Sequence, residues 1–599
     1  MLHELNCRGL GLRLISLPGL LAPALLLIAN ACGSSESNLS GPGVLRILTT
    51  ELPGAATTTT YSASLIAQGG VSPYTWSLSS GDLPPGLTLQ PSTGQIAGMP
   101  SQQGSFSFVV RVRDASNSAS ERQLSVDVSN STIADVSISL NGAAYQTWRA
   151  WRWTVRGNRY VDGTCARVPD AVLSAYLDEV VNNLGFTGIR LEQHYLQALE
   201  GAANDNADPF NLNMAGFVGG LEAPAVFNNC PVYPRIDHID RTIIPVRSRV
   251  LARGEPFDLY LSFVYFQFDR LPQWWRDNVQ EGAEAVEAYL TWFRQNYGFV
   301  PDWFTYNEPD ARHFEANRWM GNLTVALGQR FAKMGVSTRI EQPSSSTPGA
   351  AVYTYDLLAG VTGAAALVKR VSFHGYDYTT PWPPQSGIKA RNDLRSRARS
   401  IGAETAMTEV CCRSWWNGGY DTGLAYVRDM FLNMTEADIS VWEPLGIYNV
   451  CSAMGCVVGQ GSAQNLINLE HDLSTYYLNP AFWVARQFSQ FIRPGYVRLG
   501  LNCSGCTETA DRGPGVKAVA WKSPSGSIVV NLINDTGASI TTALTGIPAG
   551  VFEIHQMDPS LCRTSGPRDR CTPVVTTATS NGTFTVTLPV NAVWTLRQR

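Results

Sequence analysis

The chain has little charge and few histidines. Asp, Glu, Lys and Arg make up 16% of its 599 residues, and the formal net charge is −4. Because there is no basic excess, nucleic acid is not expected as a partner. The sequence has seven histidines and contains neither a G-x-S-x-G nor an H-E-x-x-H motif, so neither a serine hydrolase nor a metal hydrolase has a motif to support it. We expect no cofactor and no bound metal.

The N-terminal apolar stretch is too short to cross a bilayer. It covers residues 14–28 and is broken by Pro18 and Pro23. Ala29-Asn30-Ala31 is a small-residue cleavage site directly before Cys32. Residues 1–32 therefore resemble a bacterial lipoprotein signal, although such signals usually carry Leu where this chain has Ala29, and an ordinary secretory cleavage would leave the same N-terminus. We expect an exported protein: a cell-surface or periplasmic lipoprotein held at the outer membrane surface through lipid on Cys32, or otherwise a secreted protein.

The cysteines indicate disulfides. Of twelve, Cys7 is lost with the signal and Cys32 would carry lipid, which leaves ten, an even number in an exported protein. The spacing of Cys503 and Cys506 also fits half of a zinc site or a redox motif, but Cys411-Cys412, the comparable second pair, has the wrong spacing for zinc. We favour local structural disulfides. The expected close pairs are Cys451–Cys456, Cys503–Cys506 and Cys562–Cys571.

The length of the chain exceeds what one hydrophobic core fills, so about two to four domains are expected. The chain contains 16 Trp and 22 Tyr, which are high numbers. Aromatic rings stack on the apolar faces of sugars, but they are first of all core material, so composition alone leaves sugar binding open.

Residues 33–44 are a Ser/Gly-rich linker, and residues 45–130 form a first folded domain. Alternating apolar and polar residues between turn clusters predict an antiparallel β-sandwich of about eighty to a hundred residues. The segment resembles the immunoglobulin-like (cadherin-like) domains of bacterial surface proteins, which implies a spacer or adhesion module. The matching motifs are YTWSL (74–78), LPPGL (83–87), TGQIAGMP (93–100) and VRD (112–114).

From about residue 133, apolar strands alternate with helix-period segments. Helices are expected at 169–184, 282–297, 319–334, 389–401 and 424–434. Eight strands with intervening helices predict an α/β fold, a (β/α)8 TIM barrel over residues 146–494. An open doubly wound sheet is the alternative, but no Gly-rich phosphate loop follows the first strand. The expected strands are 151–155, 188–192, 259–266, 303–307, 338–342, 371–376, 405–410 and 439–443.

After residue 491 the helices stop, and strands separated by Gly, Pro and Asn predict a C-terminal β-sandwich over residues 495–599. No long linker precedes this unit, so we expect it to pack on the barrel. The strand at 136–140, within residues 131–145, precedes the barrel and is expected to join the same side sandwich. The expected C-terminal strands are 516–521, 527–533, 550–556, 583–588 and 592–596.

Two glutamates end strands on opposite sides of the predicted barrel. Glu308 follows the fourth strand, and Glu409 lies near the end of the seventh. Carboxyl ends of barrel strands meet at one mouth, and hydrolysis of a glycosidic bond needs two carboxylates there. A separation of about 5–5.5 Å would give retention of configuration, and about 6.5–9.5 Å inversion. Glu341 and Glu443 also end strands, but Glu308 is preferred because Asn307 precedes it and can hydrogen-bond a sugar hydroxyl.

Further motifs accompany this pair. Arg190 ends the second strand, His374-Gly375-Tyr376 ends the sixth, and Tyr476-Tyr477 precedes the run FSQFIRPG (488–495). Together with Asn307-Glu308 and Glu409, they make residues 133–599 resemble glycoside hydrolase family 30, in the clan of retaining (β/α)8 glycosidases. That family links its last helix to a side β-sandwich built from strands before and after the barrel. The run WRAWRW (148–153) departs from the family's Gly-rich turn into the first strand.

The resemblance implies a division of labour. Glu308 would be the general acid/base and Glu409 the nucleophile, since two neighbouring carboxylates raise one pKa at the expense of the other. Arg190 would keep Glu409 ionised through its charge and hydrogen bonds. Tyr376 would donate a hydrogen bond to Glu409, and His374 would position the sugar or the acid. On residue type alone, Arg190 could equally form a structural ion pair, and a lone His or Tyr is more often a core residue.

Trp442, at the end of the eighth strand, would form the sugar platform beneath the reacting ring, and Asn307 would bind a sugar hydroxyl. The alternative for Trp442 is packing in the barrel core. The sequence thus favours a retaining O-glycosyl hydrolase that cleaves β-glycosidic bonds of an extracellular polysaccharide or glycan by double displacement, as a monomer. A non-catalytic carbohydrate-binding surface lipoprotein with a relic barrel is the alternative.

Overall fold

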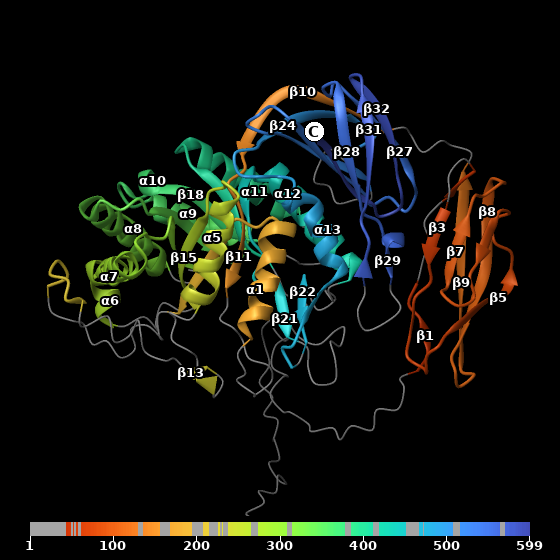
Figure 1. Ribbon diagram of the computed structural model, residues 1–599, viewed down its shortest axis with the longest axis horizontal. Helices are drawn as coiled ribbons and strands as arrows, with labels where there is room; N and C mark the ends of the chain where they lie inside the picture. Colours follow the sequence, from red (N-terminus) through yellow and green to blue (C-terminus); the bar gives the residue numbers. More distant parts are fainter. Residues whose placement is uncertain are drawn as a thin grey trace, which may run out of the picture.

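The computed structural model places three β-rich or α/β units along the chain (Figure 1). The expected signal and linker, with Cys32, lie outside the described residues, and so do Glu308 and the Cys451–Cys456 pair. The residues it describes are 44–49, 52, 55–57, 61–129, 136–155, 168–194, 208–214, 226–227, 230–231, 238–264, 273–307, 314–377, 385–410, 419–450, 466–470, 472–506, 515–563 and 570–599.

The N-terminal unit is a small all-β domain, drawn in red and orange in Figure 1. One sheet has the order β2-β9-β8-β5, a second has the order β3-β7-β6, and β1 pairs with β4. The buried side chains of Trp76, Phe108 and Val126 form its core together with other apolar residues. The strands are β1 Arg46–Ile47, β2 Ala55–Ala56, β3 Tyr61–Ser64, β4 Ala67–Gln68, β5 Thr75–Gly81, β6 Leu87–Leu89, β7 Gln95–Gly98, β8 Gly104–Arg113 and β9 Ala119–Ser129.

The central unit is a closed barrel of eight parallel strands, which confirms the predicted fold class. The order around the barrel follows the sequence, and β11 closes it against β20, with Trp151 opposite Trp442. Each predicted strand is present. The barrel strands are β11 Ala150–Val155, β12 Gly188–His194, β15 Asp258–Val264, β16 Trp303–Asn307, β17 Arg339–Ser345, β18 Val368–His374, β19 Glu404–Glu409 and β20 Ile439–Trp442.

Helices cover the outside of the barrel (Figure 1). The second helix expected from sequence, α7, is capped at both ends. Before its first residue, the Asn278 side chain accepts a hydrogen bond from the amide of Gln280. After its last residue, Gly298 adopts the left-handed conformation that Gly adopts most easily. The helices are α1 Asp170–Asp178, continued by a π-helical turn Glu179–Asn183, a second π-helical turn Ile239–Ile243 leading into α5 Ile244–Ala252, α6 Gln273–Asp277, α7 Val279–Tyr297, α8 Phe314–Met334, α9 Pro348–Ala359, α10 Ala364–Leu367, α11 Gln385–Ser400, α12 Tyr420–Glu436 and α13 Pro480–Ser489.

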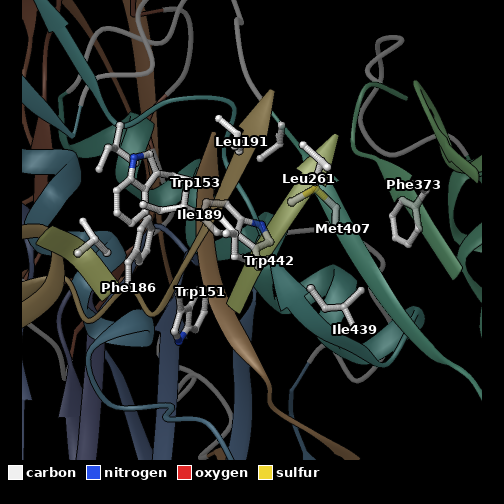
Figure 2. Close-up of a cluster of buried hydrophobic side chains, with 14 of the residues drawn as sticks. Trp151, Trp153, Phe186, Ile189, Leu191, Leu261, Phe373, Met407, Ile439 and Trp442 are labelled. Atoms are coloured by element: carbon white, nitrogen blue, oxygen red, sulfur yellow. The ribbon is translucent and has the colours of Figure 1, made fainter. Parts of the chain in front are cut away.

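The barrel strands have an apolar outer face and a polar inner face. Figure 2 shows Trp153, Ile189 and Leu191, which belong to the large core cluster between strands and helices. Their sequence neighbours point the other way. Arg152, next to Trp153, and Arg190, between Ile189 and Leu191, are fully buried and make ion pairs inside the barrel. Alternation with period two thus separates the packing layer from a charged barrel interior.

The side sandwich is built from strands on both sides of the barrel in sequence, as predicted. Strand β10 pairs antiparallel with β24 and parallel with β27 within a nine-stranded sheet of order β31-β28-β33-β26-β25-β24-β10-β27-β32. Strands β24, β27 and β31 were not predicted. The strands are β10 Val136–Thr147, β24 Val497–Ser504, β25 Val516–Lys522, β26 Ile528–Asn534, β27 Ile540–Thr545, β28 Gly550–Gln556, β31 Val574–Ser580, β32 Thr583–Leu588 and β33 Val593–Gln598.

Two of the three expected close cysteine pairs are disulfides, Cys503–Cys506 and Cys562–Cys571. The second joins the short strands β29 Cys562–Arg563 and β30 Arg570–Cys571. Small sheets complete the fold: β13 Val226–Phe227 with β14 Cys230–Pro231, and β21 Tyr448–Val450 with β22 Ile467–Leu469 and β23 Tyr476–Leu478. Among the described residues, no helix is long and apolar enough to span a membrane.

Candidate active site

Glu409 ends β19 at a β-bulge. In the pairing of β19 with β18, the register shifts so that Glu409 lies opposite His374 and Thr408 is an extra residue. A bulge re-aims the side chains around it. As a result, two consecutive residues point into the barrel: Thr408 Oγ1 lies 3.0 Å from Ser344 Oγ, and Glu409 contacts Arg190. The Glu409 side chain is almost completely buried.

Arg190 of β12 holds one oxygen of Glu409. Its Nη2 donates to Glu409 Oε2 and to Glu192 Oε1, and its Nη1 donates to the carbonyl oxygen of Thr408 at 2.8 Å. Its Nε lies 3.3 Å from Glu443 Oε1. Burial alone would lower the pKa of Arg190, but the negative charges of Glu409, Glu192 and Glu443 outweigh it and raise that pKa well above its usual range. The guanidinium therefore stays charged and favours an ionised carboxylate beside it.

Tyr376 holds the other oxygen of Glu409. Its hydroxyl donates to Glu409 Oε1 at 2.7 Å, and the Tyr376 side chain is half-buried. His374 is fully buried, with Nδ1 3.9 Å from Glu409 Oε2 and Nε2 3.2 Å from Ser344 Oγ. The structure thus brings Arg190, Tyr376 and His374 around Glu409. His374 lies behind the carboxylate and away from any open surface, where it contacts Ser344 and not a position open to a sugar.

The second candidate carboxylate, Glu308, follows the fourth strand in the sequence. Asn307 is the last residue of β16 and lies opposite Val264 of β15. Glu308 follows Asn307 and lies outside the described residues. Strands β16 and β19 are fourth and seventh around the closed barrel, so three strand steps separate them in one direction and five in the other. The carboxyl end of β16 therefore lies across the barrel mouth from the carboxyl end of β19.

Trp442 is not placed as a sugar platform. It is fully buried, its indole N–H donates to Asp429 Oδ2 of α12 at 2.9 Å, and its ring packs edge-on against Tyr426 and Trp151. Figure 2 shows Trp442 and Trp151 among the buried apolar side chains. The structure therefore corrects this expectation. Because Glu443 points inward, period-two alternation turns its neighbour Trp442 outward into the layer between β20 and α12.

The two alternative glutamates lie inside the barrel. Glu341 and Glu443 are both fully buried, and both contact the buried Arg152: Glu341 Oε1 lies 3.3 Å from its Nη2, and Glu443 Oε2 lies 3.0 Å from its Nε. Neither side chain meets solvent, so neither is a candidate for direct attack on a substrate. Sequence reasoning missed Glu192, which shares Arg190 with Glu409. The spacing Arg190-Leu191-Glu192 could have revealed it, because residues two apart on a strand share a face.

The part of the chain that the structure describes has no group of three or more His, Cys, Asp and Glu side chains arranged to hold a metal ion. The chemistry that the described residues support at this site is that of a carboxylate, Glu409, beside the buried cation of Arg190. A carboxylate fixed through both oxygens beside a guanidinium is suited to act as a nucleophile or as a stabiliser of positive charge.

Comparison with protein families identifies the two β units. Residues 44–129 match the family described as "Putative Ig domain", and residues 497–596 match the family described as "Glycosyl hydrolase family 30 beta sandwich domain". A comparison with curated proteins found no match.

Solved structures share the barrel and side sandwich. The catalytic domain of a GH30 xylanase C from Talaromyces cellulolyticus aligns with a TM-score of 0.52 at 20% identity, over 77% of this chain and all of that domain. An endo-β-1,6-glucanase gives 0.52 at 16% identity, over 77% of this chain and 94% of its own. A conserved exported protein from Bacteroides fragilis gives 0.53 at 13%, over 77% of this chain and 99% of its own. The chain has the fold of a glycoside hydrolase, a (β/α)8 barrel with a side sandwich. More particularly, its side sandwich matches the family 30 β-sandwich model, and an immunoglobulin-like domain precedes the barrel.

Proposed function

We propose that this protein is a retaining glycoside hydrolase that cleaves β-glycosidic bonds of an extracellular polysaccharide or glycan by double displacement. Glu409 is the nucleophile, Glu308 is the general acid/base, and Asn307 binds a sugar hydroxyl near the bond that breaks. The proposal rests above all on Glu409, a strand-end carboxylate fixed on one oxygen by Arg190 and on the other by Tyr376.

Each step asks for a defined protonation state. Glu409 must be ionised to attack the anomeric carbon, and the buried charge of Arg190 favours that form. Glu308 must be protonated to release the leaving oxygen, and after the sugar is bound covalently it takes a proton from the attacking water. The Tyr376 hydroxyl donates a hydrogen bond to Oε1 of Glu409. This bond fixes the orientation of the carboxylate before the substrate binds.

The test is activity on a panel of aryl β-glycosides and β-linked polysaccharides, with the wild type and the variants Glu409→Gln and Glu308→Gln. Both variants are expected to lose turnover by about 10³-fold or more, as loss of a central catalytic group usually does. Glu121→Gln is the matched control, because Glu121 lies in the immunoglobulin-like domain and pairs with Arg111. Full activity in either Gln variant would refute the assignment.

Two further readouts separate the mechanism from the alternative function. A 2-deoxy-2-fluoro glycoside should trap a covalent adduct on the peptide that carries Glu409, and product NMR should show the anomeric configuration retained. If the wild type binds glycans but turns over none of the panel, the protein is the carbohydrate-binding lipoprotein with a relic barrel that the sequence left as the alternative.

We also propose that the protein is exported as a monomer and tethered to the outer membrane surface through lipid on Cys32. The support is the signal-like segment at residues 1–32. Mass spectrometry of the mature N-terminus tests the tether, and an unmodified Cys32 would contradict it. Gel filtration with light scattering tests the monomer.

A further inference from the structure

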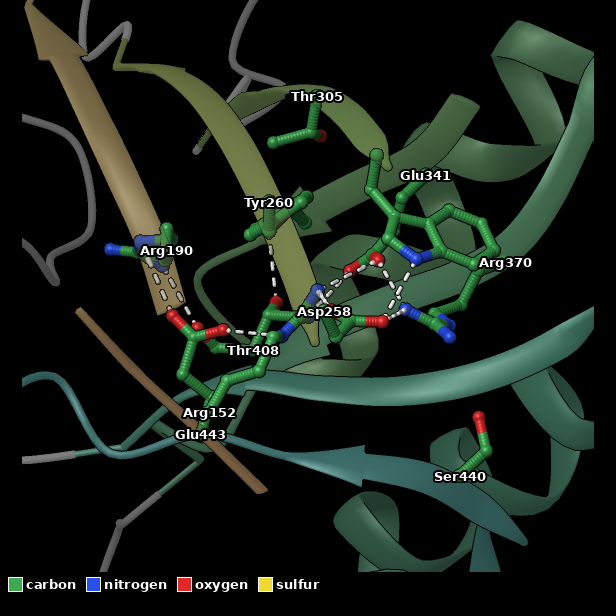
Figure 3. Close-up of polar contacts among 12 residues, drawn as sticks. Arg152, Arg190, Asp258, Tyr260, Thr305, Glu341, Arg370, Thr408, Ser440 and Glu443 are labelled. Carbon is green, nitrogen blue, oxygen red and sulfur yellow. Dashed lines mark hydrogen bonds and ion pairs between the residues drawn. The ribbon is translucent and has the colours of Figure 1, made fainter. Parts of the chain in front are cut away.

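A chain of alternating carboxylates and guanidinium groups runs through the barrel interior from Glu409 toward the opposite end of the strands. Figure 3 shows its middle part, where Arg152, Glu341 and Arg370 are joined by ion pairs of 3.3 Å and 3.1 Å. Arg370 continues to Glu404 at 2.9 Å. We call this set the interior ion-pair column, and its members in order are Glu409, Arg190, Glu443, Arg152, Glu341, Arg370 and Glu404.

Together with Glu192, which also pairs with Arg190, the described residues of the column include more buried carboxylates than buried arginines. Three fully buried arginines supply its positive charge, and four carboxylates whose side chains are at most 5% exposed pair with them. Two further carboxylates, on Asp258 and Glu404, touch the same arginines from positions 12% and 26% exposed. Removing a carboxylate's charge costs less than burying it without a cation, so this imbalance favours a proton on one of the four. The four are Glu192, Glu341, Glu409 and Glu443.

Glu443 has the surroundings that suit the proton best. Its Oε1 accepts a hydrogen bond from Thr154 at 3.0 Å, and its Oε2 lies 3.0 Å from Arg152 Nε without a well-aligned hydrogen bond among the described residues. Burial raises its pKa to about 7, against the lowering effect of Arg190 and Arg152, and the negative charge of Glu341 raises it further. Glu443 is also the one carboxylate of the column that touches both Arg190 and Arg152.

We propose that Glu443 is a positioning residue that stays protonated in the active enzyme and thereby leaves the charge of Arg190 to Glu409. This inference rests on the proposed function, because it explains how the nucleophile is kept ionised and in place. When Glu443 is neutral, Arg190 is shared by Glu409 and Glu192 alone. When Glu443 ionises at higher pH, a third carboxylate draws on the same guanidinium, and the grip of Arg190 on Glu409 weakens. Glu443 never touches the substrate.

The first test uses a 2,4-dinitrophenyl β-glycoside of the sugar that the wild type hydrolyses fastest. This leaving group departs without acid assistance, so kcat/KM reports the nucleophile and not the proton on Glu308. The wild type should lose about tenfold or more in kcat/KM as the pH rises through about 7, because a Glu409 carboxylate that Arg190 holds less firmly is less well placed for attack. Glu443→Gln cannot ionise and should lose this fall. A profile identical to that of the wild type would overturn the proposal.

Glu341→Gln is the matched control, because Glu341 is equally buried and pairs with Arg152 but does not touch Arg190. Its negative charge helps to keep the proton on Glu443, so removing it should move the fall in kcat/KM to lower pH without abolishing it. A purely structural role for the column predicts the same profile in Glu443→Gln and Glu341→Gln. Thermal unfolding of both variants shows whether they are folded.

The second test does not depend on activity. At pH 6 the difference between the infrared spectra of the wild type and Glu443→Gln should contain the C=O stretch of a buried protonated carboxyl group, and this difference band should disappear at pH 8.5. If the difference band is absent at pH 6, the proposal fails even if hydrolysis is confirmed. If the wild type hydrolyses no glycoside but shows the band, the protonated Glu443 stands and the proposed function falls.

Discussion

Arg190 donates a hydrogen bond to Glu409 although 219 positions separate the two residues in the sequence. The contact exists because β12 and β19 deliver their side chains to the same barrel interior, with β20 and β11 between them. The Arg190 guanidinium is fully buried, so water cannot supply the hydrogen bond that it donates to Glu409. This pair therefore gives the clearest tests of both the fold and the chemistry.

Replacing Arg190 should separate charge from geometry. Arg190→Lys keeps a cation but not the fork that reaches Glu409, Glu192 and Thr408 together, so kcat/KM should fall about a hundredfold. Arg190→Met leaves the buried carboxylates of Glu409 and Glu192 without this cation, and the free energy of unfolding should fall by about 3–5 kcal/mol. Steady-state kinetics and urea denaturation measure the two effects. Arg111→Lys, in the exposed pair with Glu121, should change neither.

Tyr376→Phe removes one hydrogen bond to Glu409 with no change in side-chain shape. Hydrogen bonds to charged groups contribute about 1.5–3 kcal/mol, so kcat should fall between about tenfold and a hundredfold. The melting temperature should stay nearly constant, because the Tyr376 side chain is only half-buried. Tyr353→Phe is a control with an exposed ring. An unchanged kcat would remove Tyr376 from the proposed mechanism.

Trp442→Phe distinguishes core packing from sugar binding. The variant loses the hydrogen bond to Asp429 and part of a fully buried ring, so the free energy of unfolding should fall by about 1–3 kcal/mol. KM for glycosides should not change, because the ring faces α12. Trp594→Phe, a buried ring of the side sandwich, should behave in the same way. A raised KM in Trp442→Phe alone would return the ring to the sugar site.

Stability should fall as the pH rises through the range in which Asp302 ionises. Burial, and then the charge of Asp258, raise the pKa of Asp302 to about 6. A carboxyl group with a raised pKa binds its proton more tightly in the folded state, so its contribution is complete below about pH 4 and is lost as the pH rises through about 6. The loss is on the order of 3 kcal/mol. Urea denaturation from pH 4 to pH 7 should show a shallower decline in Asp302→Asn, whereas parallel curves would contradict the assignment.

The barrel could be predicted from sequence because its strands are short, apolar and separated by long helical segments. The prediction for β16 matches its ends at Trp303 and Asn307. The expected contacts of Arg190 and Tyr376 with Glu409 came from the resemblance to a known family and not from the residue pattern alone. In the side sandwich, β31 escaped prediction because Val574–Ser580 is largely exposed and rich in Thr, so little alternation marks it. Its neighbour β28 alternates and was found.

The interior of the barrel was harder to predict, because it depends on which face of each strand turns inward. Trp442 and Glu443 are adjacent, and the choice between them as the inward residue follows from pairing with β19 and β11. The bulge at Thr408 adds a register shift that the local sequence pattern does not predict. Glu443 and Arg152 are 291 positions apart in the sequence, and they come into contact only when the barrel closes.

Strand β10 determines the order in which parts of the chain can fold during synthesis. Asn141 and Asn502, hydrogen-bonded between β10 and β24, are 361 positions apart. At about 5–20 residues per second, a ribosome needs roughly 20–70 s to make the intervening chain. During that time β10 has none of its partners, since β24 and β27 both follow the barrel. The side sandwich can therefore form only after the barrel has been synthesised. A nascent chain that stops within the barrel would leave β10 as an unpaired, exposed β edge.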